Sequence, residues 1–453
     1  MKINNTLLIN EIIKNIKNTN FIDYSKITKI NQNKLFYVAE QADKKLKIVL
    51  PFVFKRNDLL DLNSNGIEGA TGIIIEEIKK QMKKGKFSML SGNLGRRYEG
   101  LYEPITIVNS NLNIGADLWR ADKYNYIEKN KIYLSLRMIV NNDNKTNINN
   151  NYNLKTIGNK IDNLLVELNE FINKIPYNII ENETINIINQ KTLRNNLDKL
   201  GLVCFIGDYS KPARKYTRIR RHHRIAGPKE GVNIEFKTPV ELNPIEVELY
   251  NGNIITGLGI KRKEVFIISG RNAQGKSTLL ESIESGQDDH LIGDGREYII
   301  TTKNLSKATT GSMNMNGENI SLFFQKLPEG INGTPTNVKG RASGSMTMAY
   351  QIQKAMSLKK DLILIDEDNS AVNLLVSGLL SNWFEGVKPL CELIIENRNK
   401  INCSFIIVTS SLDLLTATGD RAIYLENHKA KYLDLNYFKE ELKKYYLKLS
   451  NEL

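Results

Sequence analysis

The chain has 453 residues, of which 41% are hydrophobic, and it carries a formal net charge of +13 at pH 7. This length and apolar content exclude a fibrous or wholly disordered chain and predict two or three domains. Three widely spaced cysteines exclude a disulfide framework and a zinc site built from Cys-x-x-Cys pairs, and they favour a reducing, cytoplasmic location. The basic excess favours a polyanionic partner, although the abundance of Lys, Asn and Ile also explains part of it.

Residues 1–195 are interpreted as an N-terminal α+β domain without a motif for chemistry. Apolar residues at helical spacing predict a helix within 72–85, and apolar runs predict strands within 103–119 and 131–140. The Asn-rich segment 141–153 lacks this periodicity and predicts a flexible loop. Polar residues interrupt the N-terminus, and no run reaches the roughly 18 apolar residues of a membrane span, so we expect no membrane insertion.

Residues 196–453 have the pattern of a parallel α/β domain. Residues 201–208 predict a buried strand, and Asn251-Gly252 predicts the turn of a hairpin. The runs "VFIIS", "LILID" and "FIIVT" are short and apolar, and polar residues follow each of them. Buried strands with polar loops at their carboxyl ends are typical of a parallel sheet that binds a ligand at that edge.

The segment "GRNAQGKST", Gly270 to Thr278, matches the P-loop pattern G-x-x-x-x-G-K-[ST] between a predicted strand and a predicted helix. Its glycines let backbone N–H groups face the phosphates of ATP, and the helix N-terminus adds positive potential. We expect Lys276 to contact the β- and γ-phosphates and Ser277 to bind Mg²⁺ through its hydroxyl. The predicted nucleotide-binding residues of this loop are Gly270, Asn272, Gly275, Lys276, Ser277 and Thr278.

Consecutive carboxylates follow the apolar run 362–365. Asp366 is the predicted Mg²⁺ ligand, and Glu367 is the predicted catalytic group that orients or deprotonates the attacking water. The alternative is that these acids only cap the next helix. The combination with a P-loop favours an Mg²⁺-dependent ATPase.

The P-loop, Asp366-Glu367 and "DEDNSAVN" resemble the Walker A, Walker B and D-loop segments of ABC-class ATPases. That class carries a signature motif before the Walker B acid, and Ser343 and Gly344 stand about 23 residues before Asp366, at the corresponding place. The resemblance implies that Ser343 and Gly344 begin a helix that meets the ATP held by a second protomer, so that an ATP-bound homodimer sandwiches two nucleotides.

From about residue 200 to 433 the chain resembles a narrower family, the predicted ATPases of the ABC class. "GDGREY", Gly293 to Tyr298, is hardly a general ABC feature and weighs most in this resemblance, together with "ASGS" and "LILIDEDNSAVN". The family includes a kinetoplastid mitochondrial protein associated with RNA editing. The resemblance therefore implies a P-loop NTPase of ABC-ATPase type, with a parallel sheet core and an antiparallel β subdomain.

The chain departs from the ABC pattern after "FIIVT", where Ser410 and Ser411 stand in place of the switch histidine. We therefore expect slow hydrolysis. Gln325 is the predicted Q-loop ligand of Mg²⁺, with a solvent-facing glutamine as the alternative. Tyr250 is predicted to stack on adenine, with a hairpin core position as the alternative. For His290, a structural role is favoured over contact with phosphate.

The segment 211–229 concentrates basic residues with Tyr216 among them. This density suits contact with a phosphate backbone, although a solvated loop or a loop over the phosphates of its own ATP also explains it. The predicted nucleic-acid contacts are Lys211, Arg214, Lys215, Arg218, Arg220, Arg221 and Arg224.

The favoured function is an ATPase that dimerises around ATP and uses closure to bind or remodel nucleic acid, most plausibly RNA. The alternatives are an ABC transporter motor, a chromosome or repair ATPase, and an ATP-gated scaffold. Only a short segment separates Ser277 from Ser343, which leaves no room for the long coiled coil of chromosome ATPases.

Overall fold

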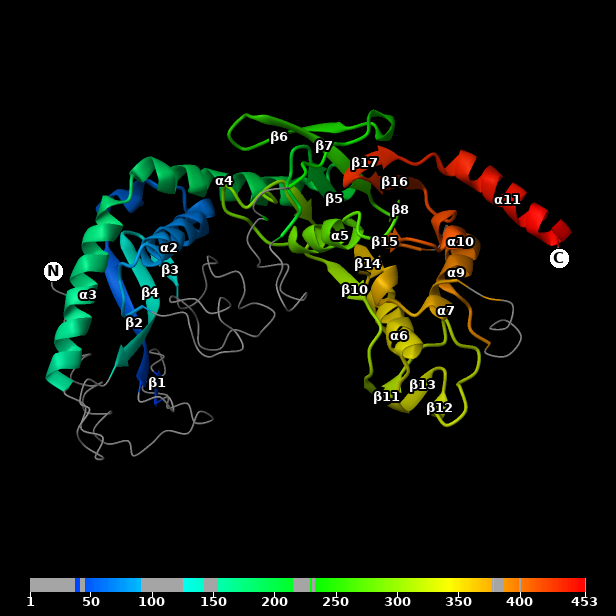
Figure 1. Ribbon diagram of the computed structural model, residues 1–453, viewed down its shortest axis with the longest axis horizontal. Helices are drawn as coiled ribbons and strands as arrows, with labels where there is room; N and C mark the ends of the chain where they lie inside the picture. The colour runs from blue at the N-terminus through cyan, green and yellow to red at the C-terminus, as the bar shows by residue number, and fades with distance from the viewer. Residues whose placement is uncertain are drawn as a thin grey trace. The chain divides into compact units, whose positions relative to one another are not determined.

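The computed structural model describes residues 37–40, 45–90, 125–141, 154–214, 229, 233–376, 378, 386–398 and 401–452. The chain divides into two compact units, residues 1–188 and 189–453, and the division falls within helix α4 (Tyr177–Asn196) (Figure 1). Each unit is described by itself. The predicted strand at 103–119 and the Asn-rich segment after Asn141 lie outside the described residues.

Unit 1 contains an antiparallel sheet with the strand order β1-β2-β4-β3. Phe52 and Phe54 of β2 are buried opposite Leu134 and Ile132 of β4, and these side chains share one core with Ile74 of helix α2. The helix predicted within 72–85 and the strand predicted at 131–140 are confirmed as α2 and β4. The elements are β1 (Tyr37–Glu40), β2 (Lys45–Lys55), η1 (Asn57–Asp61), η2 (Ser64–Gly66), α2 (Ile67–Lys83), β3 (Tyr126–Glu128), β4 (Lys131–Asn141) and α3 (Leu154–Lys174).

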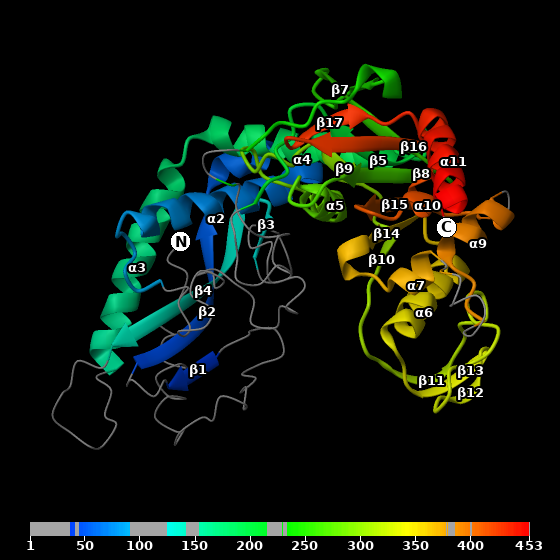
Figure 2. The ribbon, with the colours of Figure 1, turned by 45° about the vertical axis from the view of Figure 1, so that its right-hand side comes forward.

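Unit 2 is built on a six-stranded sheet with the order β10-β14-β15-β8-β16-β17, in which only the edge strand β17 runs antiparallel to its neighbour (Figure 2). The predicted parallel α/β sheet is therefore confirmed. The strands are β8 (Val265–Gly270), β10 (Leu305–Ala308), β14 (Leu362–Asp366), β15 (Ser404–Thr409), β16 (Arg421–Glu426) and β17 (Lys429–Tyr432).

Successive residues of the central strands enter different cores. Ile363 and Ile365 of β14 belong to one cluster of buried side chains, whereas Leu362 and Leu364 belong to another. Side chains alternate between the two faces of a strand, so both faces of this sheet are covered. The sequences of its central strands are therefore continuous apolar runs and do not alternate between apolar and polar residues.

Two antiparallel sheets complete unit 2, with the orders β6-β7-β5-β9 and β11-β13-β12. The predicted hairpin is confirmed, because β6 and β7 pair around the turn at Asn251-Gly252. The remaining strands are β5 (Leu202–Gly207), β6 (Ile245–Glu248), β7 (Ile254–Lys261), β9 (Ile299–Thr301), β11 (Asn314–Glu318), β12 (Asn332–Thr334) and β13 (Asn337–Arg341). The helices of unit 2 are η4 (Val240–Leu242), α5 (Lys276–Ser285), α6 (Gly344–Ser357), η5 (Glu367–Asn369), α7 (Val372–Leu375), α9 (Leu390–Asn397), α10 (Asp413–Thr416) and α11 (Leu435–Glu452).

The strand order determines where polar loops gather. Strands β8, β14 and β15 end at the same edge of the sheet, and β15 lies between the other two. Neighbouring strands are about 4.8 Å apart, so the ends of β8 and β14 are separated by roughly 10 Å. In the part of the chain that the structure describes, no helix combines the length and the apolar character needed to cross a membrane.

Candidate functional site

The loop between β8 and α5 has a backbone that requires glycine. Gly270 and Gly275 have φ values of 143° and 94°, and Ala273 between them also has a positive φ of 62°. A Cβ atom on Gly270 would lie 2.6 Å from the carbonyl oxygen of Leu425. The strand, glycine loop and helix predicted from the sequence are therefore present, with α5 beginning at Lys276.

Lys276 is 5% exposed and lies over this loop. Its Nζ atom donates to the carbonyl oxygens of Gly270 and Arg271 at 2.7 and 2.9 Å. Burial lowers the pKa of Lys276, and the negative charges of Asp368, Glu367 and Asp366 oppose this shift. The ammonium and the acidic end of β14 therefore belong to one electrostatic site.

Other residues of the loop differ in exposure. Ser277 and Thr278 are half-buried in the first turn of α5, and Asn272 is exposed. Gln274 accepts a hydrogen bond through Oε1 from the backbone N–H of His428 at 3.3 Å. His428 belongs to the turn between β16 and β17, so this turn adjoins the loop.

Asp366 ends β14 and is 3% exposed. Its carboxylate accepts only long hydrogen bonds, 3.3 Å each, from the Asp368 N–H and the Asn369 side-chain amide. The alternative cap role is thus partly realised, because Asp366 is the N-cap of the short helix η5. Carboxylate and hydroxyl oxygens suit Mg²⁺, which is commonly held by few protein ligands together with phosphates and water. Asp366 and Ser277 fit that donor set.

Glu367 extends toward the loop after β15. Its Oε1 accepts from the Ser411 hydroxyl at 2.7 Å, and its Oε2 accepts from the backbone N–H groups of Ser410 and Ser411. The serines that replace the expected histidine therefore contact the predicted catalytic acid. Sequence reasoning identified this position but did not predict the contact.

Ser343 begins helix α6, as the resemblance implied. Its side chain accepts from the Met346 N–H at 3.4 Å, which makes Ser343 the N-cap, and Gly344 is the first residue of the helix. Ser343 is exposed. A second protomer could therefore reach this helix N-terminus.

Gln325 is exposed and follows Phe324, and its backbone N–H donates to Gly386 O at 2.9 Å. Gln325 does not follow a strand of the central sheet. The edge strand beside β14 is β10, and the loop after β10 contains Thr309 and Thr310. The Thr310 N–H and hydroxyl both donate to Asn369 O, at 2.8 and 3.2 Å. Thr310 therefore contacts η5, the short helix that follows Asp366. The role of Gln325 as a Mg²⁺ ligand stays a prediction.

Tyr250 lies on the turn of the β6–β7 hairpin and is 55% exposed. The alternative of a hairpin core position is therefore wrong. Stacking on adenine stays a prediction for this residue.

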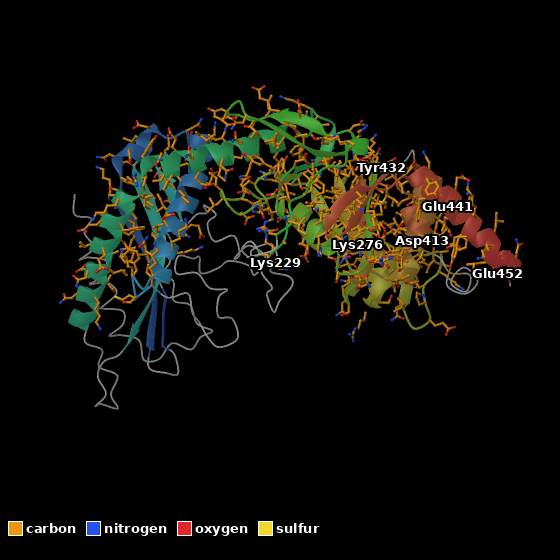
Figure 3. The ribbon with its side chains drawn as sticks, turned by 45° about the horizontal axis from the view of Figure 1, so that its top comes forward. Lys229, Lys276, Asp413, Tyr432, Glu441 and Glu452 are labelled. Atoms are coloured by element: carbon orange, nitrogen blue, oxygen red, sulfur yellow. The ribbon has the colours of Figure 1, made fainter. Side chains whose placement is uncertain are left out.

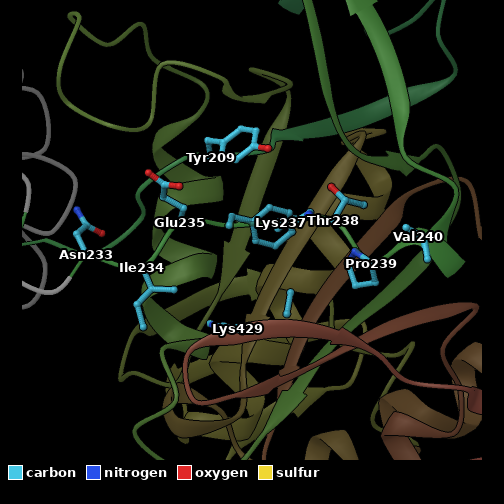
Figure 4. A pocket seen from close by; sticks show the side chains of 11 residues that line it. Tyr209, Asn233, Ile234, Glu235, Lys237, Thr238, Pro239, Val240 and Lys429 are labelled. Carbon is cyan, nitrogen blue, oxygen red and sulfur yellow. The ribbon is translucent and has the colours of Figure 1, made fainter.

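A cavity of about 680 Å³ that the sequence did not reveal is lined by residues 233–240 together with Tyr209, Lys429 and Ala430 (Figure 4). Tyr209 and Lys429 line opposite sides of it, and Lys429 directly follows the turn residue His428 that contacts Gln274. Tyr209 has a positive φ of 67°, and its N–H donates to Phe236 O at 2.7 Å. In the sequence, the only local indication of this cavity is Tyr209 itself, which stands two residues after the buried strand β5.

His290 has a structural role. It is 1% exposed, its backbone groups pair with the Gln190 side chain at 2.7 and 2.8 Å, and its Nε2 lies 3.1 Å from Ser285 O. Burial, with a further contribution from Arg296, lowers the pKa of His290 to about 4. The imidazole is therefore neutral at physiological pH.

The prediction that Arg214 contacts nucleic acid is wrong. Arg214 is 5% exposed and donates to the Asp294 carboxylate at 2.9 Å and to the Asp294 carbonyl at 2.8 Å. Asp294 also binds Arg296, so "GDGREY" forms a buried ion network. Burial, with a further contribution from the Arg296 charge, lowers the pKa of Arg214 to about 10.

Of the remaining predicted nucleic-acid contacts, only Lys211 lies within the described residues. Lys211 is half-exposed and pairs with Glu235 at 3.2 Å. Five of the predicted contacts lie outside the described residues, namely Lys215, Arg218, Arg220, Arg221 and Arg224.

Figure 3 shows Lys276 and Asp413 in unit 2. Burial and the charge of Glu367 raise the pKa of Asp413, so these two carboxyl groups interact electrostatically. Among the described residues, no group of three or more His, Cys, Asp and Glu side chains is arranged to hold a metal ion.

Comparisons with known proteins identify the family of this chain. The family model for the ABC_ATPase P-loop domain matches residues 169–452. An uncharacterized protein of Methanocaldococcus jannaschii is 61% identical over 450 residues, which cover 98% of each chain. The zinc import ATP-binding protein ZnuC of Marinobacter nauticus is 24% identical over 182 residues, which cover 38% of this chain and 67% of that protein. The solved structure of cbiO1 from Clostridium perfringens, part of an ABC transporter complex, aligns with a TM-score of 0.31 and 14% identity, covering 55% of this chain and 97% of its own.

Proposed function

Because the chain belongs to the ABC_ATPase family of P-loop domains, we propose that it is an Mg²⁺-dependent enzyme that hydrolyses ATP to ADP and phosphate. The observation that carries this proposal is the placement of Lys276, Asp366 and Glu367 at one edge of the parallel sheet. Phosphate binding requires a cation, and activation of the attacking water requires a carboxylate beside it.

Each residue has a role in the proposed reaction. The backbone N–H groups from Gly270 to Thr278 bind the phosphates, and Lys276 leaves its two carbonyl partners to contact the β- and γ-oxygens. Ser277 and Asp366 hold Mg²⁺, which neutralises charge on the phosphates when it is bound. Glu367 orients the attacking water and accepts its proton. Without a histidine after β15, we expect slow turnover.

The ATP-bound form is proposed to be a homodimer. Ser343 and Gly344 present the exposed N-terminus of α6, whose positive dipole end favours a phosphate. This surface would complete the ATP site of a second copy of the chain. Closure of the dimer is then the conformational step that ATP controls.

RNA is the proposed polyanionic partner. The proposal now depends on Lys211, Lys215, Arg218, Arg220, Arg221 and Arg224, because Arg214 is buried. Replacing Arg218, Arg220 and Arg221 with Ala should weaken RNA binding and reduce its salt dependence, since each phosphate contact releases counterions. Fluorescence anisotropy of a labelled RNA at several salt concentrations measures the RNA affinity and its salt dependence. ATP affinity should be unchanged.

The second candidate is an ATP-gated scaffold or motor subunit of a membrane or multiprotein complex. The observation in its favour is the match to proteins named as zinc import ATP-binding proteins. Copurification with an integral membrane protein would support this alternative over RNA.

The experiment that tests the proposed function uses a Glu367→Gln variant, which should bind ATP without hydrolysing it. Size-exclusion chromatography with light scattering, with and without Mg-ATP, should show a dimer only in the presence of nucleotide. Nucleic acid that copurifies should be sensitive to RNase. A monomer under both conditions would contradict the ATP-sandwich dimer.

A further inference from the structure

The loop that follows β15 binds both oxygens of the Glu367 carboxylate. The Ser411 hydroxyl donates to Oε1 at 2.7 Å, and the Ser411 N–H donates to Oε2 at 3.3 Å. The Ser410 N–H also donates to Oε2. Three donors from two adjacent residues thus fix the orientation of this carboxylate.

The register of the central sheet explains the contact. Asp366 lies opposite Val408 in the pairing of β14 with β15, so Glu367 and the serines leave neighbouring strands at the same edge. On the other side of β15, Thr409 lies opposite Ser269, the residue before the P-loop glycine Gly270. The two serines therefore directly follow β15, which lies between β14, with Asp366 at its end, and β8, which precedes the P-loop.

The loop itself is fixed on the side away from Glu367. The Thr409 hydroxyl lies 2.9 Å from the Thr416 hydroxyl, and both residues are buried. The Thr416 N–H donates to Leu412 O at 2.9 Å within the single turn of α10, so Thr409 is tied to the helix that follows the serines. Donors on a backbone held in this way are already oriented before substrate binds, so they lose little entropy on binding.

Resting on the proposed ATPase function, we propose that Ser411 is a positioning residue that holds Glu367 for the attacking water. An ionised carboxylate offers about four acceptor sites. Three are occupied by the loop, which leaves one for a water molecule. The hydroxyl of Ser411 is the only side-chain donor to Glu367 among the described contacts, so it is the group that mutation can remove without moving the backbone.

The test compares Ser411→Ala with Ser411→Thr, which keeps a hydroxyl. Loss of a hydrogen bond to a charged group that orients water should lower kcat about tenfold in Ser411→Ala while KM for ATP changes less than about twofold. Ser411→Thr should recover most of kcat. Thr418→Ala is the matched control, because its hydroxyl donates to Leu415 O at 2.7 Å and not to Glu367. A wild-type kcat in Ser411→Ala would overturn the proposal.

A double-mutant cycle in the nucleotide-free protein tests the contact without catalysis. Ser411→Ala and Glu367→Ala should be non-additive in urea unfolding, because each removes the same hydrogen bond. Additive effects would overturn the contact. If the wild type hydrolyses ATP in a Glu367-dependent manner but kcat is insensitive to Ser411, only the positioning role fails. If the wild type does not hydrolyse ATP, the proposed function fails and the positioning role fails with it.

Discussion

The ammonium of Lys276 is bound to two carbonyl oxygens of its own loop, and three carboxylates at the end of β14 partly oppose the effect of its burial. Replacing Lys276 with Ala removes the charge that meets the phosphates. We expect ATP affinity to fall at least about 30-fold, since charge-assisted hydrogen bonds contribute roughly 2 kcal/mol or more. Isothermal titration calorimetry with Mg-ATP measures this. Lys303→Ala, at an exposed position, is the control, and equal affinity in the two variants would contradict the assignment.

Tyr209 and Tyr250 are the two tyrosines that we propose as alternatives for stacking on the adenine base. Tyr209 lines the cavity beside the turn that contacts the P-loop, whereas Tyr250 lies on the exposed hairpin turn. Stacking of a base on an aromatic ring is worth about 1–3 kcal/mol. We therefore expect Tyr209→Ala to weaken ATP binding about tenfold while binding of tripolyphosphate is unchanged. A loss confined to Tyr250→Ala would instead support the base site predicted from the sequence.

His290 should make stability depend on pH. Its pKa of about 4 lies below the unfolded value near 6.5, so the unfolded chain binds a proton first as the pH falls. The free energy of unfolding should therefore decrease between about pH 6.5 and 4, on the order of 3 kcal/mol in total.

Urea unfolding of His290→Gln measures this contribution. The variant should be less stable at neutral pH, because it loses the contact to Ser285 O, and its stability should depend less on pH in that window. His428→Gln, at an exposed turn, is the control. An unchanged pH dependence in His290→Gln would contradict a neutral buried imidazole.

Helix α6 carries the proposed contact between protomers at its first residues. Arginine at position 343 removes the N-cap and places a long side chain at the helix N-terminus. We expect Ser343→Arg to abolish ATP-driven dimerisation and to reduce hydrolysis at least about 100-fold, while ATP binding to the P-loop stays within a few-fold of wild type. Light scattering and calorimetry distinguish the two effects. Dimerisation that survives the substitution would contradict a role of α6 in the second protomer's site.

The local elements of the site were predictable from the sequence because each depends on neighbouring residues. The strand, glycine loop and helix around Gly270, the strand before Asp366 and the helix that begins at Gly344 all follow from apolar runs, positive φ positions and capping residues. Local patterns are sufficient where the backbone conformation is set within a few residues.

The features that the sequence did not reveal depend on contacts between distant segments. Arg214 is buried because Asp294 lies beside it, 80 residues later in the chain. The cavity joins Tyr209 to Lys429, and the Ser411 hydroxyl after β15 reaches Glu367 after the neighbouring strand β14. Charge density alone could not show which basic residues are paired inside the fold, since burial is a property of the tertiary structure.

The family match covers residues 169–452, so it spans the described part of unit 2 and the C-terminal end of unit 1. The antiparallel sheet of unit 1 precedes the matched range and has its own core. The nucleotide site lies entirely in unit 2. Most of unit 1 therefore lies outside the range that the family match accounts for.

The measurement that tests the central claim most directly is phosphate release from Mg-ATP by the wild type and by Glu367→Gln. Both proteins should bind ATP, because Glu367 orients water and does not hold the phosphates. The wild type should hydrolyse ATP slowly, and Glu367→Gln should lose at least about 100-fold of that rate. Equal rates of hydrolysis in the two proteins would contradict the role of Glu367, and the absence of hydrolysis in both would contradict an ATPase and favour an ATP-gated scaffold.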